Sequence, residues 1–352
     1  MRVGIQFFPS IGPDMKSARD YWQDALSLVG LCDRYGYSHV RTVEHYFLPY
    51  GGYSPNPVVF LAAAAQHTRN ARLVTGAVLP AFNNPLKLAG ELAMLDALCD
   101  GRLDIGFARA FLPHEFARFG VKLDESRSRF DEGMQQVRLL LEQENVTAVG
   151  RFHSFHNVTS LPRPTQKPRP PFYVAALATK ESFERAGAAG HGIMAIPIAG
   201  GPMAELIGLY REAWARAGHA GTGTVMLAFH MFCHANQVEA ERIARDPLNR
   251  YLQSLVSAAS DWTNGASSVD YPGYDKIIAS LARDNFDTQV EKCAAWVGTP
   301  ERILDIVTTY HRQIGDFEIA SLQVNFNDIT LANAEASMRL FGDKVLPRML
   351  RL

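Results

Sequence analysis

The stretch ARLVTGAVLPAFNNPLKLAGELAMLDALCDGRLDIGFARAF, residues 71–111, decides the fold of this chain. Residues 73–79 form a continuous apolar run, which is typical of a strand buried on both faces of a parallel sheet. Asn84 is a favourable helix N-cap, and Pro85 suits the first helical position because its missing N–H leaves no bond unmade there. Residues 103–108 read as the next strand. Strand, helix and strand in this order predict a parallel βαβ unit with a right-handed crossover.

Outward from this unit, apolar strand-like segments alternate with helical segments along the whole chain. The eight strands are expected at residues 3–8, 38–44, 73–79, 103–108, 172–176, 192–196, 225–233 and 319–326. Helices are expected over 15–35, 58–68, 84–98, 126–144, from 179, over 203–217, from 300 and over 331–345. This alternation predicts an α/β fold, a TIM (β/α)8 barrel with insertions, in a single domain spanning 1–352.

Two segments interrupt the alternation. Residues 145–171 are expected to form a β-hairpin and a proline-rich extended connection, an insertion rather than a linker between domains. Residues 256–287 are weakly periodic and rich in polar residues, and such long irregular stretches are usually lids or disordered segments. Trp262, Tyr271 and Tyr274 could close over a substrate, so this segment is a candidate active-site lid. A surface insertion without a catalytic part is the alternative.

Composition restricts the class of function. The 35 basic and 36 acidic residues give a net charge of −1, which argues against a nucleic-acid or membrane partner. The chain shows no membrane span and enters a strand without a signal peptide, so a cytoplasmic location is expected. Four scattered cysteines predict buried free thiols and no metal site. Dinucleotide, P-loop and nucleophile-elbow motifs are missing from the sequence.

Candidate catalytic residues stand where the second strand ends, at Glu44-His45-Tyr46. In a TIM barrel the active site lies at the C-terminal ends of the strands. An imidazole can donate and accept protons near neutral pH, and a neighbouring carboxylate can fix its tautomer. A histidine that only caps the strand end is the alternative.

A phosphate site is the second candidate feature. Arg109 follows the fourth strand, Arg127 opens the next helix, and Thr179 is the expected N-cap of the helix after strand five. Guanidinium groups beside a helix N-terminus would bind phosphate through charge-assisted hydrogen bonds and oriented N–H groups. Surface ion pairs are the alternative, and they are the favoured reading for Arg129.

Several motifs, in their order and spacing, resemble the bacterial luciferase family of flavin-dependent monooxygenases. They are Glu44-His45, VTGAVLP (74–80), GRLDIGFAR (101–109), FARFGVKLDESR (116–127), VGTPERILDIV (297–307) and SMRLFGDKVLP (337–347). The family fold is a TIM barrel. The resemblance implies that reduced FMN binds at the C-terminal face, reacts with oxygen, and oxygenates an organic substrate through a flavin hydroperoxide. The substrate would be a metabolite such as an aldehyde, a ketone or a biosynthetic intermediate, and a separate flavin reductase would supply the reduced cofactor.

The resemblance also assigns roles to individual residues. His45 matches the histidine needed for catalysis, and Glu44 matches the carboxylate beside it near the flavin. Arg109 matches a flavin-phosphate ligand, and Arg127 matches another family arginine. The loop after strand five matches the part that holds the phosphate, here Ala176, Leu177, Ala178 and Thr179.

Two structural features follow from the same resemblance. Thr75-Gly76 matches a non-prolyl cis peptide beneath the flavin ring. Luciferase-like barrels pair through helices on one side, which correspond here to 58–69 and 84–98, so a two-fold homodimer is expected.

The sequence also departs from luciferase. Ala108 stands in place of a reactive cysteine, Tyr46 in place of a second histidine, and Leu177 in place of a carboxylate in the phosphate loop. These differences argue against light emission from a long-chain aldehyde but leave flavin binding intact. Two alternatives remain open: deazaflavin-dependent hydride transfer on the same barrel, and a flavin-binding relative without turnover.

Overall fold

The computed structural model describes residues 1–350, and its centre is a closed barrel of eight parallel strands. The strands follow one another around the barrel in the order β1, β2, β3, β4, β7, β8, β9, β11, and β11 pairs again with β1. Their bounds are β1 (Arg2–Phe7), β2 (His39–Thr42), β3 (Arg72–Val78), β4 (Leu103–Ala108), β7 (Phe172–Ala176), β8 (Gly192–Ala195), β9 (Val225–Cys233) and β11 (Ile319–Gln323). The predicted TIM barrel and its eight strands are confirmed.

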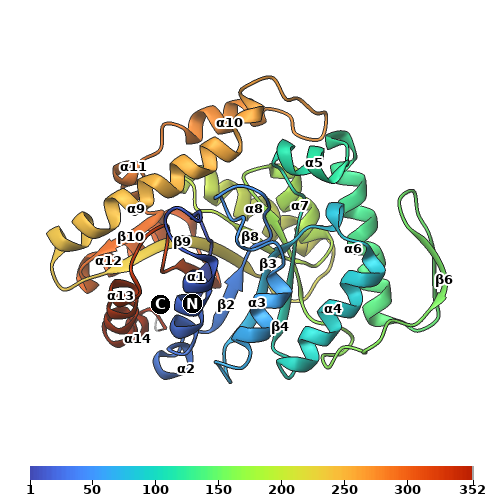
Figure 1. Cartoon of the computed structure of the whole chain (residues 1–352), viewed down its shortest axis with the longest axis horizontal. Coiled ribbons are helices and arrows are strands. Elements are labelled where there is room, and N and C mark those ends of the chain that lie inside the picture. The colour runs from blue at the N-terminus through green and yellow to red at the C-terminus, as the bar shows by residue number, and fades with distance from the viewer. Residues whose placement is uncertain (351–352) are drawn as a thin grey trace.

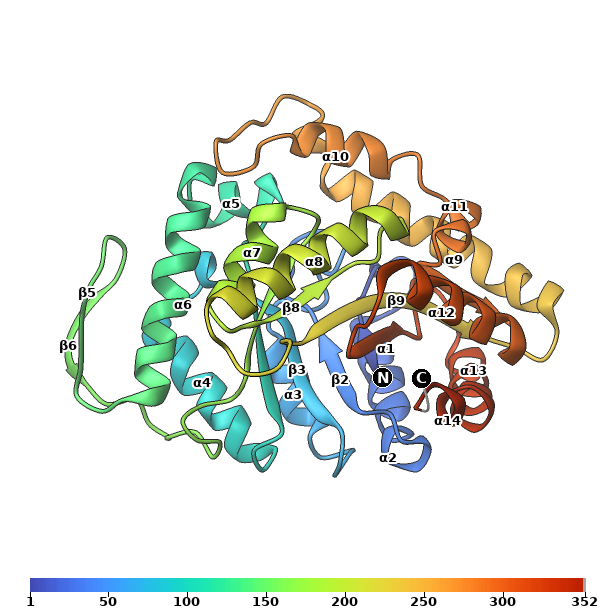
Figure 2. The same cartoon turned by 180° about the vertical axis from the view of Figure 1, so that it is seen from behind.

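Helices surround the barrel (Figures 1 and 2). Their bounds are α1 (Ala18–Val29), α2 (Cys32–Tyr35), α3 (Pro57–Ala64), α4 (Pro85–Leu98), α5 (Pro113–Phe119), α6 (Ser126–Glu142), α7 (Lys180–Ala188), α8 (Gly200–Arg216), α9 (Gln237–Ala258), α10 (Tyr274–Leu281), α11 (Phe286–Glu291), α12 (Pro300–Ile314), α13 (Leu331–Lys344) and α14 (Leu346–Met349). The helix expected over 15–35 is instead divided into α1 and α2. The sequence reading missed α5, α9, α10, α11 and α14, and also β10 (Ala295–Gly298), which pairs with β9 outside the closed ring.

The local signals around the central unit act as expected. The Asn84 side chain accepts a hydrogen bond from the N–H of Leu86 at 2.9 Å, and Pro85 occupies the first helical position of α4. Leu88, Leu92 and Leu95 on α4 are buried against the sheet. The unit therefore forms from a cap, a proline and one apolar stripe, as the sequence predicts.

The pairing of β3 with β4 is irregular near its C-terminal end, between Thr75 and Val78. The Thr75 hydroxyl donates to the carbonyl of Gly106 at 3.0 Å and accepts from its N–H at 2.9 Å. A non-prolyl cis peptide bond is present, but it joins Gly76 and Ala77. The predicted cis bond at Thr75-Gly76 is therefore wrong by one residue.

The insertion over 145–171 begins with the expected antiparallel hairpin, β5 (Val146–Val149) and β6 (Ser154–Val158). The hairpin stands away from the barrel beside α6 in both views (Figures 1 and 2). The barrel closes where β1, near the start of the chain, pairs with β11, near its end. No helix among residues 1–350 is both long and apolar enough to cross a membrane.

The segment 256–287 differs from the expected irregular stretch. It contains the end of α9, a 3-10 turn over Ser260–Trp262, all of α10 and the start of α11. Trp262 and Tyr271 are each 2% exposed, so the segment contributes aromatic side chains to the core in spite of its polar composition. In Figure 1 it runs along the upper edge of the molecule, next to α5.

Candidate active site

Glu44 lies just beyond the C-terminal end of β2 and is almost completely buried. Its Oε1 accepts hydrogen bonds from the Tyr46 hydroxyl at 2.5 Å and the Asn83 amide at 2.9 Å, and its Oε2 accepts from the N–H of Leu79 at 3.0 Å. Burial raises the pKa of Glu44 to about 7, although these three hydrogen bonds oppose the rise. This carboxyl group therefore changes its charge near neutral pH.

His45 is paired with a second buried carboxylate, Glu115 at the start of α5. His45 Nδ1 lies 3.1 Å from Glu115 Oε1, and the same oxygen accepts from the N–H of Tyr46 at 2.9 Å. Glu115 is fully buried, and its Oε2 has no hydrogen-bond partner among residues 1–350. With Nδ1 donating to Glu115, Nε2 is the nitrogen left to take part in proton transfer.

The sequence reading missed Glu115. Its position 70 residues after His45 gives no local signal that the two side chains meet. The available signal was its place in the segment that leaves the C-terminal end of β4, because such segments build the active site of a TIM barrel.

Aromatic rings surround the His45 imidazole. The ring centres of Tyr50, Phe8 and Phe111 lie 5.2, 5.5 and 6.1 Å from its centre. All three rings belong to the apolar packing around the mouth of the barrel. This environment limits the access of water to the imidazole.

Arg109 and Arg127 are brought together by the segment that precedes α10. Nη1 of Arg109 donates to the carbonyl of Asp270 at 2.7 Å, and its guanidinium lies 4.4 Å from the centre of the Tyr271 ring. The Asp270 carboxylate accepts from the N–H of Arg127 at 2.9 Å and the Ser126 hydroxyl at 3.1 Å. Asp270 therefore links the loop after β4 to the start of α6.

The four residues predicted for the phosphate loop lie partly exposed between β7 and the first turn of α7: Ala176, Leu177, Ala178 and Thr179. Thr179 is the N-cap, but its side chain makes no capping hydrogen bond. The first N–H groups of a helix have no partner within the helix. Nη2 of Arg127 lies 3.3 Å from Glu181 in this first turn, so Arg127 extends to the same helix end. Arg129 pairs with Glu125 at 2.9 Å, as the ion-pair reading favoured.

Thr75 and Gly76, the two residues predicted to lie beneath the flavin ring, both make hydrogen bonds within the protein. The Thr75 side chain is committed to β4. The Gly76 carbonyl accepts a hydrogen bond from Arg41 on β2 at 2.9 Å. Arg41 was not among the predicted site residues.

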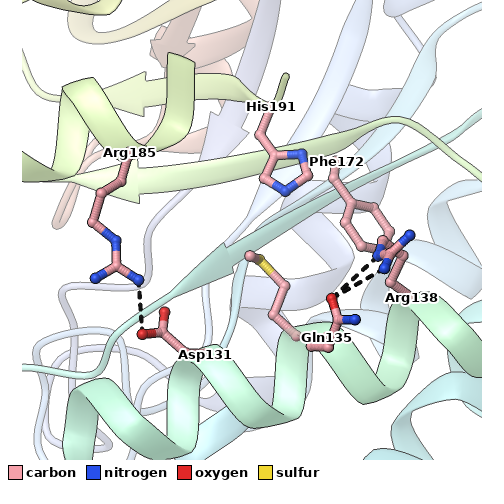
Figure 3. A pocket seen from close by; sticks show the side chains of 7 residues that line it. Asp131, Gln135, Arg138, Phe172, Arg185 and His191 are labelled. Carbon is pink, nitrogen blue, oxygen red and sulfur yellow. Dashed lines mark hydrogen bonds and ion pairs between the residues drawn. The ribbon is translucent and has the colours of Figure 1, made fainter. Parts of the chain in front are cut away.

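A cavity of about 220 Å³ lies elsewhere, between α6 and the strand ends opposite the candidate site (Figure 3). Phe172 at the start of β7 and His191 just before β8 line it, and Arg185 pairs with Asp131 at 2.7 Å across it. Burial lowers the pKa of His191 to about 4, so this imidazole is neutral at pH 7. The cavity shares no residue with the candidate active site.

Metal-binding groups do not gather in the part of the chain that the structure describes. Residues 1–350 contain no cluster of three His, Cys, Asp or Glu side chains that could hold an ion. The four cysteines, Cys32, Cys99, Cys233 and Cys293, are buried free thiols, as expected. Glu44, His45 and Glu115 are the titratable groups on which the candidate site is built.

We predict that Glu44→Gln changes how stability depends on pH. Because burial raises the pKa of Glu44 from 4.5 to about 7, its contribution to folding is fully present below the unfolded value and is lost as the pH rises through 7. From pH 5 to pH 8 the wild type should lose up to about 3 kcal/mol of unfolding free energy relative to the variant. Urea unfolding at both pH values measures this difference, and parallel pH profiles would contradict it.

Comparison with known proteins gives a consistent result. The luciferase-like monooxygenase family profile matches residues 1–316. The crystal structure of monooxygenase RslO1 from Streptomyces bottropensis is 42% identical, has a TM-score of 0.89, and matches over 99% of this chain and 100% of that one. The oxygenating constituent of 3,6-diketocamphane monooxygenase from Pseudomonas putida, in complex with FMN, is 19% identical with a TM-score of 0.82. It matches over 99% and 98% of the two chains and shows the shared fold.

A curated relative adds to this result. The oxygenase component of flavin-dependent trigonelline monooxygenase from Acinetobacter baylyi is 30% identical over 240 residues, which are 67% of this chain and 66% of the relative. The chain thus spans about half to two thirds of the length of two curated relatives that it matches.

Proposed function

The chain belongs to the luciferase-like monooxygenase family, and we propose that it uses reduced FMN and molecular oxygen to oxygenate a small organic metabolite. One observation carries the proposal: the buried His45–Glu115 pair lies at the same C-terminal end of the barrel as Arg109 and as the start of α7, which Arg127 reaches through Glu181. The first can place a proton donor or acceptor beside the reacting group, and the second has the chemistry of a phosphate site.

The residues present fit a flavin phosphate. The Arg109 guanidinium donates to a neutral carbonyl and stacks on Tyr271, and no carboxylate among residues 1–350 forms an ion pair with it. Its positive charge is therefore available to an anionic ligand. The first N–H groups of α7, beside Thr179, would add oriented donors. The ring of the cofactor would then lie toward Glu44 and Gly76 at the mouth of the barrel.

When bound, reduced FMN supplies the electrons that activate molecular oxygen. The chain positions the reactants and moves protons. Glu115 fixes the His45 tautomer by accepting from Nδ1, and Nε2 then serves as the acid or base at the reacting group. The aromatic rings around His45 keep water away from it.

A separate flavin reductase would supply the reduced cofactor. The sequence contains no dinucleotide-binding motif, so nothing in it provides for reduction of FMN by a nicotinamide. The trigonelline relative is an oxygenase component, a name that supports the same division of labour.

An anaerobic titration tests the proposal. The protein should bind reduced FMN, and admission of oxygen should then oxidise the bound flavin with less release of peroxide than from free reduced FMN. Saturation by a deazaflavin instead, with hydride transfer and no consumption of oxygen, would establish the alternative chemistry. Binding of FMN with as much peroxide release as from free reduced FMN would identify a non-catalytic relative.

We propose that residues 256–287 act as a lid. The Trp262 indole donates to the carbonyl of Phe111 at 2.8 Å, the Tyr271 hydroxyl donates to the carbonyl of Ala110, and Arg109 is covered by the same segment. These contacts close the segment over the loop that leaves β4. A lid of this kind excludes water while oxygen chemistry proceeds.

Replacement of residues 262–274 by a short Gly/Ser linker tests the lid. FMN should still bind, but peroxide release should rise and the yield of oxygenated product per flavin should fall, because water enters the site. Both quantities are measured in single turnovers with the intact protein as control. An equal yield of oxygenated product per flavin in the two proteins would show that the segment is a surface insertion without a catalytic part.

We also propose a two-fold homodimer formed through α3 and α4, which lie side by side (Figure 1). These two helices expose large apolar side chains: Val59, Leu86, Met94 and Leu98. Several exposed apolar side chains on adjacent helices are typical of an interaction surface, and the same patch on each copy gives an isologous interface.

Light scattering at micromolar concentration should therefore give twice the mass of the chain. A charge in the patch should prevent the association, so Met94→Glu should give a monomer, whereas Val149→Glu in the protruding hairpin should not change the mass. A wild-type monomer would contradict the proposal.

A further inference from the structure

An arginine side chain lies inside the barrel beneath its mouth. On β2, Val40 packs in the main apolar core, whereas His39 and Arg41 point into the barrel interior. His39 Nε2 lies 2.9 Å from the Ser321 hydroxyl of β11, and both residues are buried. The His39–Ser321 pair occupies the barrel interior next to Arg41, on the side toward the N-terminal ends of the strands. Arg41 follows His39 by two residues on β2, so it lies one layer nearer the C-terminal mouth of the barrel, and the residue as a whole is partly exposed.

The positive charge of Arg41 is not compensated. Nη1 donates to the Gln6 amide oxygen at 2.5 Å and Nη2 to the Gly76 carbonyl at 2.9 Å, and both acceptors are neutral. Among residues 1–350 the buried Nε has no partner, and no carboxylate forms an ion pair with Arg41. Burial lowers its pKa to about 10, so the side chain stays charged at neutral pH.

Another arginine of the same barrel provides the contrast. Arg72 at the start of β3 binds the Asp104 carboxylate with two nitrogens, at 2.8 and 2.6 Å. Removing a cation from water without a counter-ion costs free energy, so cations in protein interiors are normally paired. Arg41 departs from this rule at the end of the barrel where the candidate site lies.

The glycine at position 76 leaves room for the Arg41 side chain beside β3. A Cβ atom at Gly76 would lie 1.9 Å from Arg41 Nε, so only a glycine allows the guanidinium to approach this part of β3. Gly76 is also where the cofactor ring is expected. Arg41 thus lies below the proposed ring site, and the contact depends on the missing side chain of Gly76.

We propose that Arg41 is the cation that compensates the negative charge of the reduced flavin ring. This inference rests on the proposed function. Two-electron reduction with uptake of one proton gives the neutral ring one negative charge, and the electrons come from the reductase. A fixed cation near the ring binds the anionic reduced form more tightly than the neutral oxidised form. Arg41 therefore makes the site selective for the form of FMN that the reaction needs.

Binding of both redox forms tests this assignment. Dissociation constants of oxidised and reduced FMN are measured anaerobically for the wild type, Arg41→Met and Arg41→Lys. Arg41→Met should lose about tenfold or more in affinity for reduced FMN but little for oxidised FMN. Each tenfold change in this ratio lowers the midpoint potential of the bound flavin by about 30 mV for a two-electron couple. Arg41→Lys keeps the charge and should retain most of the preference.

Other outcomes separate the inference from its premise. Equal weakening of both redox forms, or no change in either, would show that Arg41 only holds the Gly76 carbonyl and would overturn the inference. A wild type that binds neither form would instead refute the proposed function. Thermal unfolding checks that the variants fold, and Arg41→Gln, which keeps an amide donor for the Gly76 carbonyl, replaces Arg41→Met if that variant does not.

Discussion

His45→Ala is expected to lower the rate of oxygenation about 10²-fold or more, which is the usual effect of losing a general acid or base. The binding of FMN should remain nearly unchanged, because the imidazole pairs with Glu115 and the proposed phosphate site consists of other residues. Single-turnover product formation with preloaded reduced FMN measures the rate, and a separate titration measures the affinity.

Two further variants sharpen this prediction. Glu115→Gln keeps the shape of the partner but removes its charge, so it should change the pH profile of turnover more than the affinity for FMN. His234→Ala removes an imidazole that is hydrogen-bonded only near its own backbone, and it should leave turnover unchanged. If His45→Ala turns over at the wild-type rate, His45 only caps the strand end and takes no part in proton transfer.

The parts of the fold that the sequence predicts correctly depend on local signals. The helix α4 begins where the Asn84 cap and Pro85 place it, and strands such as β3 appear as largely apolar runs because they are buried on both faces. Such signals need only a few neighbouring residues, so they are visible without any knowledge of the tertiary structure.

The helix α9 shows where local signals fail. Pro247 lies inside it, and a proline normally ends or kinks a helix. Buried side chains on both sides of the proline, such as Ala244 and Leu248, pack against the rest of the molecule and maintain the helix. Tertiary packing therefore outweighs the local penalty, which a single sequence does not reveal.

The same contrast between local signals and tertiary contacts holds for the candidate site. Glu44, His45 and Arg109 became candidates because they follow predicted strands at the end of a barrel where active sites lie. The partners that define their chemistry are distant in sequence: Glu115 is 70 residues from His45, and Asp270 is 161 residues from Arg109. Their contacts depend on how the strands close into a barrel and on how the segment 256–287 packs, so periodicity and spacing could not identify them.

Arg109→Ala should weaken the binding of FMN by roughly 1.5–3 kcal/mol, the scale of a charge-assisted hydrogen bond to an ionised group. This loss corresponds to roughly a 10- to 150-fold increase in the dissociation constant. Arg129→Ala is the matched control, because Arg129 pairs with Glu125 and stacks on Phe152 near the start of the same helix as Arg127. It should leave the affinity for FMN nearly unchanged.

Riboflavin, which lacks the phosphate, distinguishes two ways in which Arg109 could act. If Arg109 binds the phosphate, Arg109→Ala weakens FMN but not riboflavin, so the preference of the variant for FMN over riboflavin decreases. If Arg109 instead holds the lid through the Asp270 carbonyl and the Tyr271 ring, both ligands lose affinity equally. We expect the first result, because no carboxylate among residues 1–350 pairs with this guanidinium and its charge is free to meet a phosphate. An unchanged affinity for both ligands would show that Arg109 does not take part in FMN binding.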